Sequence, residues 1–294
     1  MASAPVAQSP QIPASPQKTS WQSILWFAAL LALCYGPILY RMGVQWATDE
    51  NMSHGFFVPV VAGYIAWQRR DALLATPRQS NGWGLFLVLF AAAQALAATL
   101  GAELFTARLS FVIALFGVIL YLGGTKWLKI LLFPLLLLVF MIPIPAIIYA
   151  ALTLKLQMLA SQLGERIIAA AGIPVLRAGN TLILPSQTLD IAEACSGIRS
   201  LLSLAFLSLV YAYLTDKRIW MRWVLLAFTV PIAIAANGIR VGLTGILSEV
   251  NTKLAQGLYH ETEGFIVFAV ALVALIVTHS VIKLFARKFE KANR

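Results

Sequence analysis

Long apolar runs, separated by polar linkers that are mostly short, constrain this chain more than any other feature of its sequence. A membrane-spanning helix needs roughly 20 mostly apolar residues, and fewer where protein shields it. The chain is 60% hydrophobic and 12% charged, which is more apolar sequence than one soluble core can bury. We therefore expect an all-α polytopic integral membrane protein. Its spans should number about eight and cover 22–40, 55–68, 82–100, 109–124, 128–151, 197–214, 222–247 and 264–283, the second being the weakest.

The two ends of the chain differ from the apolar middle. Residues 1–20 are rich in Pro, Ser, Ala and Gln, which predicts a disordered N-terminal segment. Residues 21–286 should form one multi-span membrane domain, and 287–294 a basic tail. The first apolar run is span-length and carries no convincing cleavage site, so we expect it in the mature protein.

Basic residues indicate how the spans are oriented. Lys and Arg collect in alternate linkers and near both ends of the chain, which predicts that both termini are cytoplasmic. The net charge of +10 is therefore interpreted as a topology signal, and no nucleic-acid partner is expected. The linkers expected to face outward hold most of the acidic residues and are 41–54, 101–108, 152–196 and 248–263.

The linker 152–196 is the only long one. Its first part, 154–168, has apolar residues at helical spacing and could lie along the outer interface of the membrane. Residues 175–184 predict a short β-hairpin around Ala178-Gly-Asn180. Such a hairpin could form the wall of a cleft or offer a strand edge to an extended peptide. A packed cap without substrate contact is an equally good interpretation.

Cys195 stands where this linker meets the sixth span, followed directly by Ser196 and Gly197. Arg199, four residues later, can share a helix face with the thiol and favour its thiolate form. A lone membrane cysteine is often a small apolar filler, which is our interpretation of Cys34 in the middle of the first span.

Arg240 lies inside the seventh predicted span, near its outer end. An arginine costs at least ~2.5 kcal/mol at a bilayer centre, so it normally has a partner or a task. It could support catalysis, reach the membrane surface, or pair with Glu193 or Glu249. Asn237 could orient a catalytic group or bridge two helices. Small residues nearby, Gly238, Gly242 and Gly245, would let another helix approach closely.

Two histidines are also expected on the outer side. His260 precedes the last span among acidic residues and could act as base and acid, although a solvated loop histidine is the plainer interpretation. His54 is a candidate for structure or substrate entry, whereas His279, inside the last span, is expected to pack. Cysteine, arginine and histidine at one membrane face could together form an acyl-transfer site. No metal or nucleotide motif is present in the sequence, so no cofactor is implied.

Three short motifs resemble the exosortase family of bacterial inner-membrane proteins. They are Glu193-Ala-Cys-Ser-Gly-Ile-Arg199, Ala236-Asn-Gly-Ile-Arg240 and the segment around His260, with Ser53-His-Gly55 as weaker support. The similarity extends over roughly residues 22–283, and it resembles the exosortase type associated with exopolysaccharide loci and with proteins that carry a PEP-CTERM sorting signal.

The resemblance implies Cys195 as nucleophile, Arg240 as catalytic arginine and His260 as proton-transfer residue, with Arg199 as the rival arginine at the oxyanion. It also implies a cysteine peptidase or transpeptidase whose active site faces the periplasm. Its substrates would be membrane-anchored proteins that end in a Pro-Glu-Pro motif, a transmembrane helix and a basic tail. Water or an unknown amine acceptor would release the product. The alternative is a transporter or structural subunit of a polysaccharide-export complex, in which Arg240 binds an anionic group.

Overall fold

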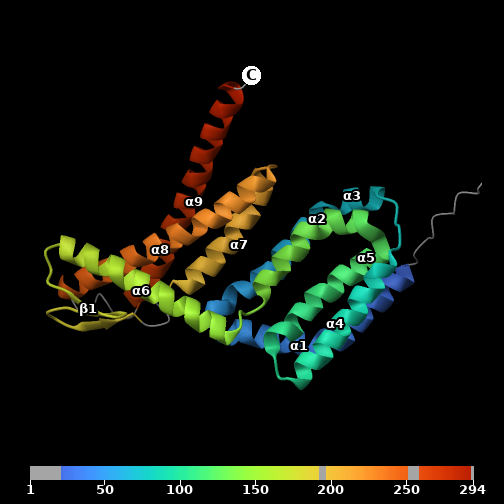
Figure 1. The fold of residues 1–294 in the computed structure, drawn as a ribbon, viewed down its shortest axis with the longest axis horizontal. Helices are drawn as coiled ribbons and strands as arrows, with labels where there is room; N and C mark the ends of the chain where they lie inside the picture. The colour runs from blue at the N-terminus through green and yellow to red at the C-terminus, as the bar shows by residue number, and fades with distance from the viewer. Residues whose placement is uncertain (1–20, 192–196, 251–257, 293–294) are drawn as a thin grey trace, which may run out of the picture. The chain divides into compact units, whose positions relative to one another are not determined.

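The computed structural model describes residues 21–191, 197–250 and 258–292, which are helical apart from one small sheet (Figure 1). Two compact units are present, Met1–Val44 with Pro59–Ile142, and Gln45–Val58 with Pro143–Arg294. Within the described residues, 7 helices are long and apolar enough to cross a membrane. The prediction of an all-α polytopic membrane protein is confirmed. These helices are Leu25–Thr48, Gly82–Leu100, Leu104–Met141, Ala146–Ala170, Ile198–Thr215, Ile219–Val250 and Gly264–Ala286.

The first unit contains most of α1 (Trp21–Thr48), together with α2 (Phe57–Gln68), α3 (Arg70–Ala75), α4 (Gly82–Leu100) and α5 (Leu104–Leu137). Helices α4 and α5 meet at glycines, because a Cβ on Gly117 would lie 2.8 Å from the Gly84 carbonyl oxygen. Helix α2 has 12 residues, and at 1.5 Å per residue it is shorter than a bilayer core of roughly 30 Å. The predicted span 55–68 thus corresponds to a helix, but this helix is not among the 7 described helices that are long enough to cross a membrane by themselves.

Helix α5 is broken at Gly124, whose φ of 77° and ψ of −171° are not helical. The ribbon of α5 changes direction along its length (Figure 1). The predicted span 109–124 lies in the part before this break. The predicted span 128–151 has wrong bounds, because α5 ends at Leu137 and is followed by the 3₁₀ turn η2 (Leu138–Met141).

Helix α6 (Ala146–Ala170) begins directly after Pro143 and Pro145. Proline removes a helical hydrogen bond and disfavours helix in the residue before it, so these prolines end one helix and start the next. The stretch 154–168, predicted as a separate interfacial helix, is instead the latter part of α6. This 25-residue helix has the length and composition of a span.

The second unit contains α6 and three further helices, α7 (Ile198–Thr215), α8 (Ile219–Val250) and α9 (Leu258–Ala292). Helices α6 and α8 pack closely at two of the expected glycines. A Cβ on Gly238 would lie 2.5 Å from Leu163 Cβ, and one on Gly242 would lie 2.6 Å from Ile167 Cγ2. The expected close approach of a helix at this glycine series is confirmed. A separate apolar core joins α7, α8 and α9 and includes Leu204, Leu225 and Leu275.

The sheet lies in the same unit and has the order β1 (Leu176–Ala178), β2 (Thr181–Ile183) and β3 (Thr188–Asp190), all antiparallel. The predicted hairpin is confirmed as β1 and β2, and its turn has Gly179 at a φ of 68°. A type II′ turn requires a positive φ at its first central position, which glycine adopts without strain. Strand β3 was not predicted. Side chains of the sheet and its flanks pack onto α6 and α8, namely Leu182, Leu184 and Ile191 against Ala160, Ile168 and Val241.

Candidate active site

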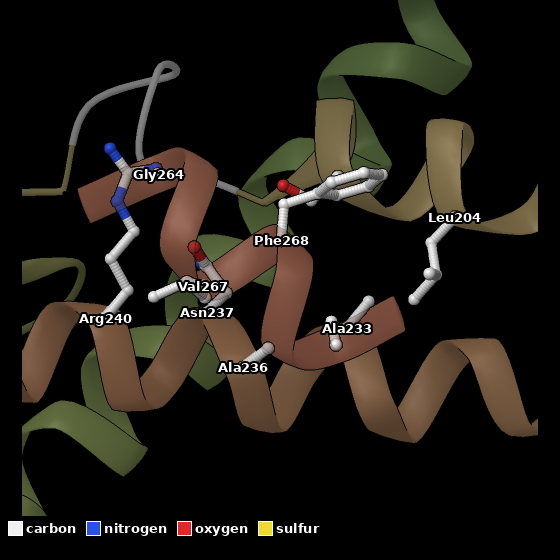
Figure 2. A pocket seen from close by; sticks show the side chains of 10 residues that line it. Leu204, Ala233, Ala236, Asn237, Arg240, Gly264, Val267 and Phe268 are labelled. Carbon is white, nitrogen blue, oxygen red and sulfur yellow. The ribbon is translucent and has the colours of Figure 1, made fainter. Parts of the chain in front are cut away.

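Arg240 extends from α8 toward α9, and its half-buried guanidinium lies against Gly264 (Figure 2). A Cβ on Gly264 would lie 3.6 Å from Arg240 Cζ and from Nη2, which is ordinary van der Waals contact. The guanidinium therefore lies beside the α9 backbone at Gly264. Arg240 therefore lies beside α9, the helix that also contains position 260.

Asn237 lies one turn before Arg240 on α8, and it is buried. Its amide packs against Gly197, because a Cβ there would lie 2.8 Å from Asn237 Cγ and 3.0 Å from Nδ2. Gly197 precedes the first turn of α7 and has a φ of 77°, in the left-handed region that favours glycine. Glycine is therefore required here by both the backbone and the space.

A narrow pocket between α7, α8 and α9 adjoins these contacts (Figure 2). Its interior has room for about one water molecule. Polar side chains of Ser200, Asn237 and Arg240 line one part, and the rest is apolar, with Leu204 and Phe268 among the residues there. Sequence analysis missed Ser200 and Phe268, for which only their helical spacing from the motifs was a signal.

Three predicted site residues, Glu193, Cys195 and Ser196, lie outside the described residues. Cys195 comes two positions before Gly197 in the sequence. Position 260 is on the backbone of α9, but its side chain lies outside the description. It is four residues before Gly264, which places the two positions on one side of the helix.

Arg199 points to another part of the second unit. Its Nη2 is 2.8 Å from Glu50 Oε2, and its Nε donates to Asn51 Oδ1 at 3.4 Å. Both partners belong to the 3₁₀ helix η1 (Glu50–Phe56), which also contains His54. Sequence analysis did not identify these partners, because 149 residues separate Arg199 from Glu50.

One interpretation of Arg240 was that it pairs with Glu249, and this interpretation is wrong. Residues nine apart on the continuous helix α8 lie on opposite faces, roughly 13.5 Å apart along its axis. The Glu249 carboxylate instead accepts hydrogen bonds from Ser186 N at 3.0 Å and Ser186 Oγ at 2.6 Å. Glu249 therefore holds the loop between β2 and β3.

At the other end of α7, a buried polar cluster joins Asp216 and Arg218 to α9. Asp216 accepts hydrogen bonds from Arg218 Nε at 3.2 Å and Nη2 at 3.1 Å, and lies 3.5 Å from His279 Nε2. Tyr211 Oη is 3.0 Å from His279 Nδ1. The expected packing role of His279 is confirmed by its burial, with 3% of its surface exposed. Hydrogen bonds from Arg218 hold the pKa of Asp216 well below its ordinary value.

We predict that Asp216→Asn destabilises the protein by about 2 kcal/mol, because the buried carboxylate that accepts two hydrogen bonds from the half-buried Arg218 loses its charge. Since the folded-state pKa is lowered, the carboxylate stabilises the fold at pH values above its ordinary pKa near 4 and loses this effect below it. Thermal unfolding in detergent at pH 7 should therefore show a lower Tm than wild type, and the difference should shrink only below about pH 4. Asp71→Asn is the matched control, because Asp71 pairs with Arg70 at the surface with 84% of its side chain exposed. Equal Tm values for wild type and Asp216→Asn would contradict this role.

The family comparison agrees with the contacts among the motifs. The family model described as transmembrane exosortase (Exosortase_EpsH) matches residues 46–277, most of the chain and both segments that carry Asn237, Arg240 and Gly264. This chain belongs to the exosortase family. No curated protein and no solved structure matches it in the other two comparisons. Membership supports a role for this exosortase as a membrane sorting transpeptidase that acts on membrane-anchored sorting-signal substrates.

Proposed function

We propose that this exosortase is a cysteine peptidase and transpeptidase that cleaves C-terminal Pro-Glu-Pro sorting signals through a thioester. The observation that carries the proposal is the pair of contacts between Asn237 and Gly197 and between Arg240 and Gly264. They join three sequence segments, each of which contains or adjoins one proposed catalytic residue. A structural role alone would not require an arginine at the polar end of a pocket.

Chain geometry limits how far the other two proposed catalytic residues are from Gly197 and Gly264, the glycines beside Asn237 and Arg240. Cys195 is two residues from Gly197, a span of at most about 7 Å. Position 260 is one turn of α9 from Gly264, a rise of roughly 6 Å. Both distances are compatible with side chains that meet at the Arg240 guanidinium.

The proposed reaction begins when the Cys195 thiolate attacks the scissile carbonyl carbon. The carbonyl π electrons move to oxygen, and the fork of Arg240 stabilises this oxyanion. As the C–N bond breaks, His260 protonates the leaving amine, and the acyl group remains on sulfur as a thioester. Water or an amine acceptor then attacks the thioester, transfers a proton to His260 and releases Cys195.

Arg240 is favoured over Arg199 as the oxyanion donor. Arg240 lines the pocket, whereas the Arg199 guanidinium is 2.8 Å from the Glu50 carboxylate. Arg199 is not among the residues that line the pocket. We assign Arg199 to positioning the start of α7 against η1, and His54 to supporting that same 3₁₀ segment.

The proposed site faces the periplasm from the bacterial inner membrane, and the natural setting is exopolysaccharide production. This orientation rests on the alternation of basic linkers. We predict that reporter fusions after Gly179 and after Asn251 are active outside the membrane, and that fusions after Asp216 are active inside. Fusions at 179 and 251 on opposite sides of the membrane would show that the proposed site cannot assemble.

The proposal is tested by co-expression with a tagged substrate that ends in a Pro-Glu-Pro motif, a transmembrane helix and a basic tail. Wild type should convert the substrate to a shorter form, and Cys195→Ala should leave it at full length. Cys34→Ala is the matched control, because Cys34 is an exposed thiol in the apolar helix α1 and should not affect processing. Normal processing by Cys195→Ala would exclude the cysteine mechanism and favour a transport or structural role.

A further inference from the structure

Strand β3 has an outer edge whose main-chain groups are unpaired among the described residues. Ile191 N donates to Asn180 O at 3.1 Å, and Leu184 N donates to Gln187 O at 2.9 Å. Hydrogen-bonded pairs alternate in an antiparallel ladder, so residues 187, 189 and 191 direct their main chains toward β2. Thr188 and Asp190 therefore direct their N–H and C=O groups outward, and both residues are exposed.

The opposite edge of the sheet is protected. The same alternation leaves Arg177 as the outward residue of β1. Its side chain forms an ion pair with Glu165 at 3.1 Å and donates to Gly179 O at 3.0 Å. A charged side chain at an edge is a common means of preventing strand addition. On β3, by contrast, the Asp190 carboxylate accepts from the Thr181 hydroxyl across the sheet at 2.7 Å.

The sheet is held in place on both sides of β3. Leu182 and Ile191 are buried in the cluster with α6 and α8, and Ser186 is hydrogen-bonded to Glu249 of α8. An edge that is already ordered binds an extended peptide at a lower entropic cost than a flexible one. The chain then runs from Asp190 to Cys195 in five residues, a reach of at most about 18 Å.

From this geometry we infer that the outer edge of β3 binds the extended substrate segment next to the scissile bond as a fourth strand. The inference rests on the proposed function, because the occupant is the peptide that Cys195 attacks. Main-chain hydrogen bonds to Thr188 and Asp190 would provide binding with little dependence on side chains. An added strand uses the N–H groups of alternate residues only. A Pro-Glu-Pro segment is compatible with this, since its prolines are alternate residues.

Disulfide scanning tests the arrangement directly. The enzyme would carry Thr188→Cys with Cys34→Ala and Cys195→Ala, so that no other thiol is present and the substrate stays intact. Single cysteines would be placed at successive substrate positions around the Pro-Glu-Pro motif and oxidised in membranes. Paired strands bring Cα atoms to about 5.5 Å, within disulfide range. We expect the strongest cross-link at the substrate position opposite Thr188, weaker ones two residues to either side, and none at the positions between. Leu176→Cys, exposed on the protected strand β1, should form none.

A second pair of variants, with Cys195 intact, tests whether the main-chain N–H of residue 188 binds the substrate. Thr188→Pro removes an outward N–H but no bond to β2, and should slow processing by about tenfold. Thr188→Ala keeps that N–H and should process at the wild-type rate. Equal processing by the two variants, or cross-links without a period of two, would overturn the inference. If either result is found but Cys195→Ala still abolishes processing, the proposed function stands. Only the strand-edge binding site would then be excluded.

Discussion

Arg240→Lys is expected to lower the processing rate by about 10²–10³, with protein levels near those of wild type. Lysine keeps the positive charge but loses the planar fork that can donate to an oxyanion and a neighbour together. Lysine also lacks the guanidinium that lies beside the α9 backbone at Gly264. The measurement is the rate at which a tagged substrate is shortened after induction, normalised to enzyme in the membrane fraction.

Arg199→Lys is the matched control for that experiment. A lysine can still pair with Glu50, and a pair this exposed contributes only about 0–1 kcal/mol. We expect processing near the wild-type rate. A large loss in Arg199→Lys, with little effect of Arg240→Lys, would transfer the oxyanion role to Arg199.

Gly197→Ala is expected to reduce processing by at least about tenfold, because two costs coincide at this position. An alanine Cβ would lie 2.8 Å from Asn237 Cγ, so the start of α7 or the amide must shift. The φ of 77° adds roughly 1–2 kcal/mol for any residue with a Cβ. Since Cys195 is two residues away, such a shift moves the thiol relative to Arg240.

Gly172→Ala separates the two costs. Gly172 has a φ of 80°, but a Cβ there would meet nothing within 4 Å. This variant therefore has the backbone cost without the clash, and processing should remain close to wild type. Equal losses in the Gly172 and Gly197 variants would show that the contact with Asn237 does not position the thiol.

Much of the helical architecture was predictable, because a long apolar run has few alternatives in a membrane. The helices at 82–100 and 197–214 were predicted within a few residues of α4 and α7. The boundary between α5 and α6 was misplaced, since the apolar run continues through Pro143 and Pro145 and only the prolines mark the break. Strand β3 has three residues, too few to show a period of two.

The sequence pointed to the polar residues of the candidate site, but not to the residues that they contact. Arg240 and Asn237 stood out because polar groups are costly within an apolar helix. Their neighbours Gly264 and Gly197 did not, because each lies near its polar residue only once α7, α8 and α9 have packed together. The link from Arg199 to η1 joins distant segments and depends on the folded second unit.

The central claim is that Cys195 carries the substrate as a thioester. The most direct measurement is mass analysis of the enzyme isolated after co-expression with substrate, with and without hydroxylamine, which cleaves thioesters. We predict an adduct between Cys195 and the N-terminal product that hydroxylamine removes. It should be absent in Cys195→Ala and enriched in His260→Ala, because release of the acyl group also needs a base. Normal substrate processing without any adduct at Cys195 would contradict the account.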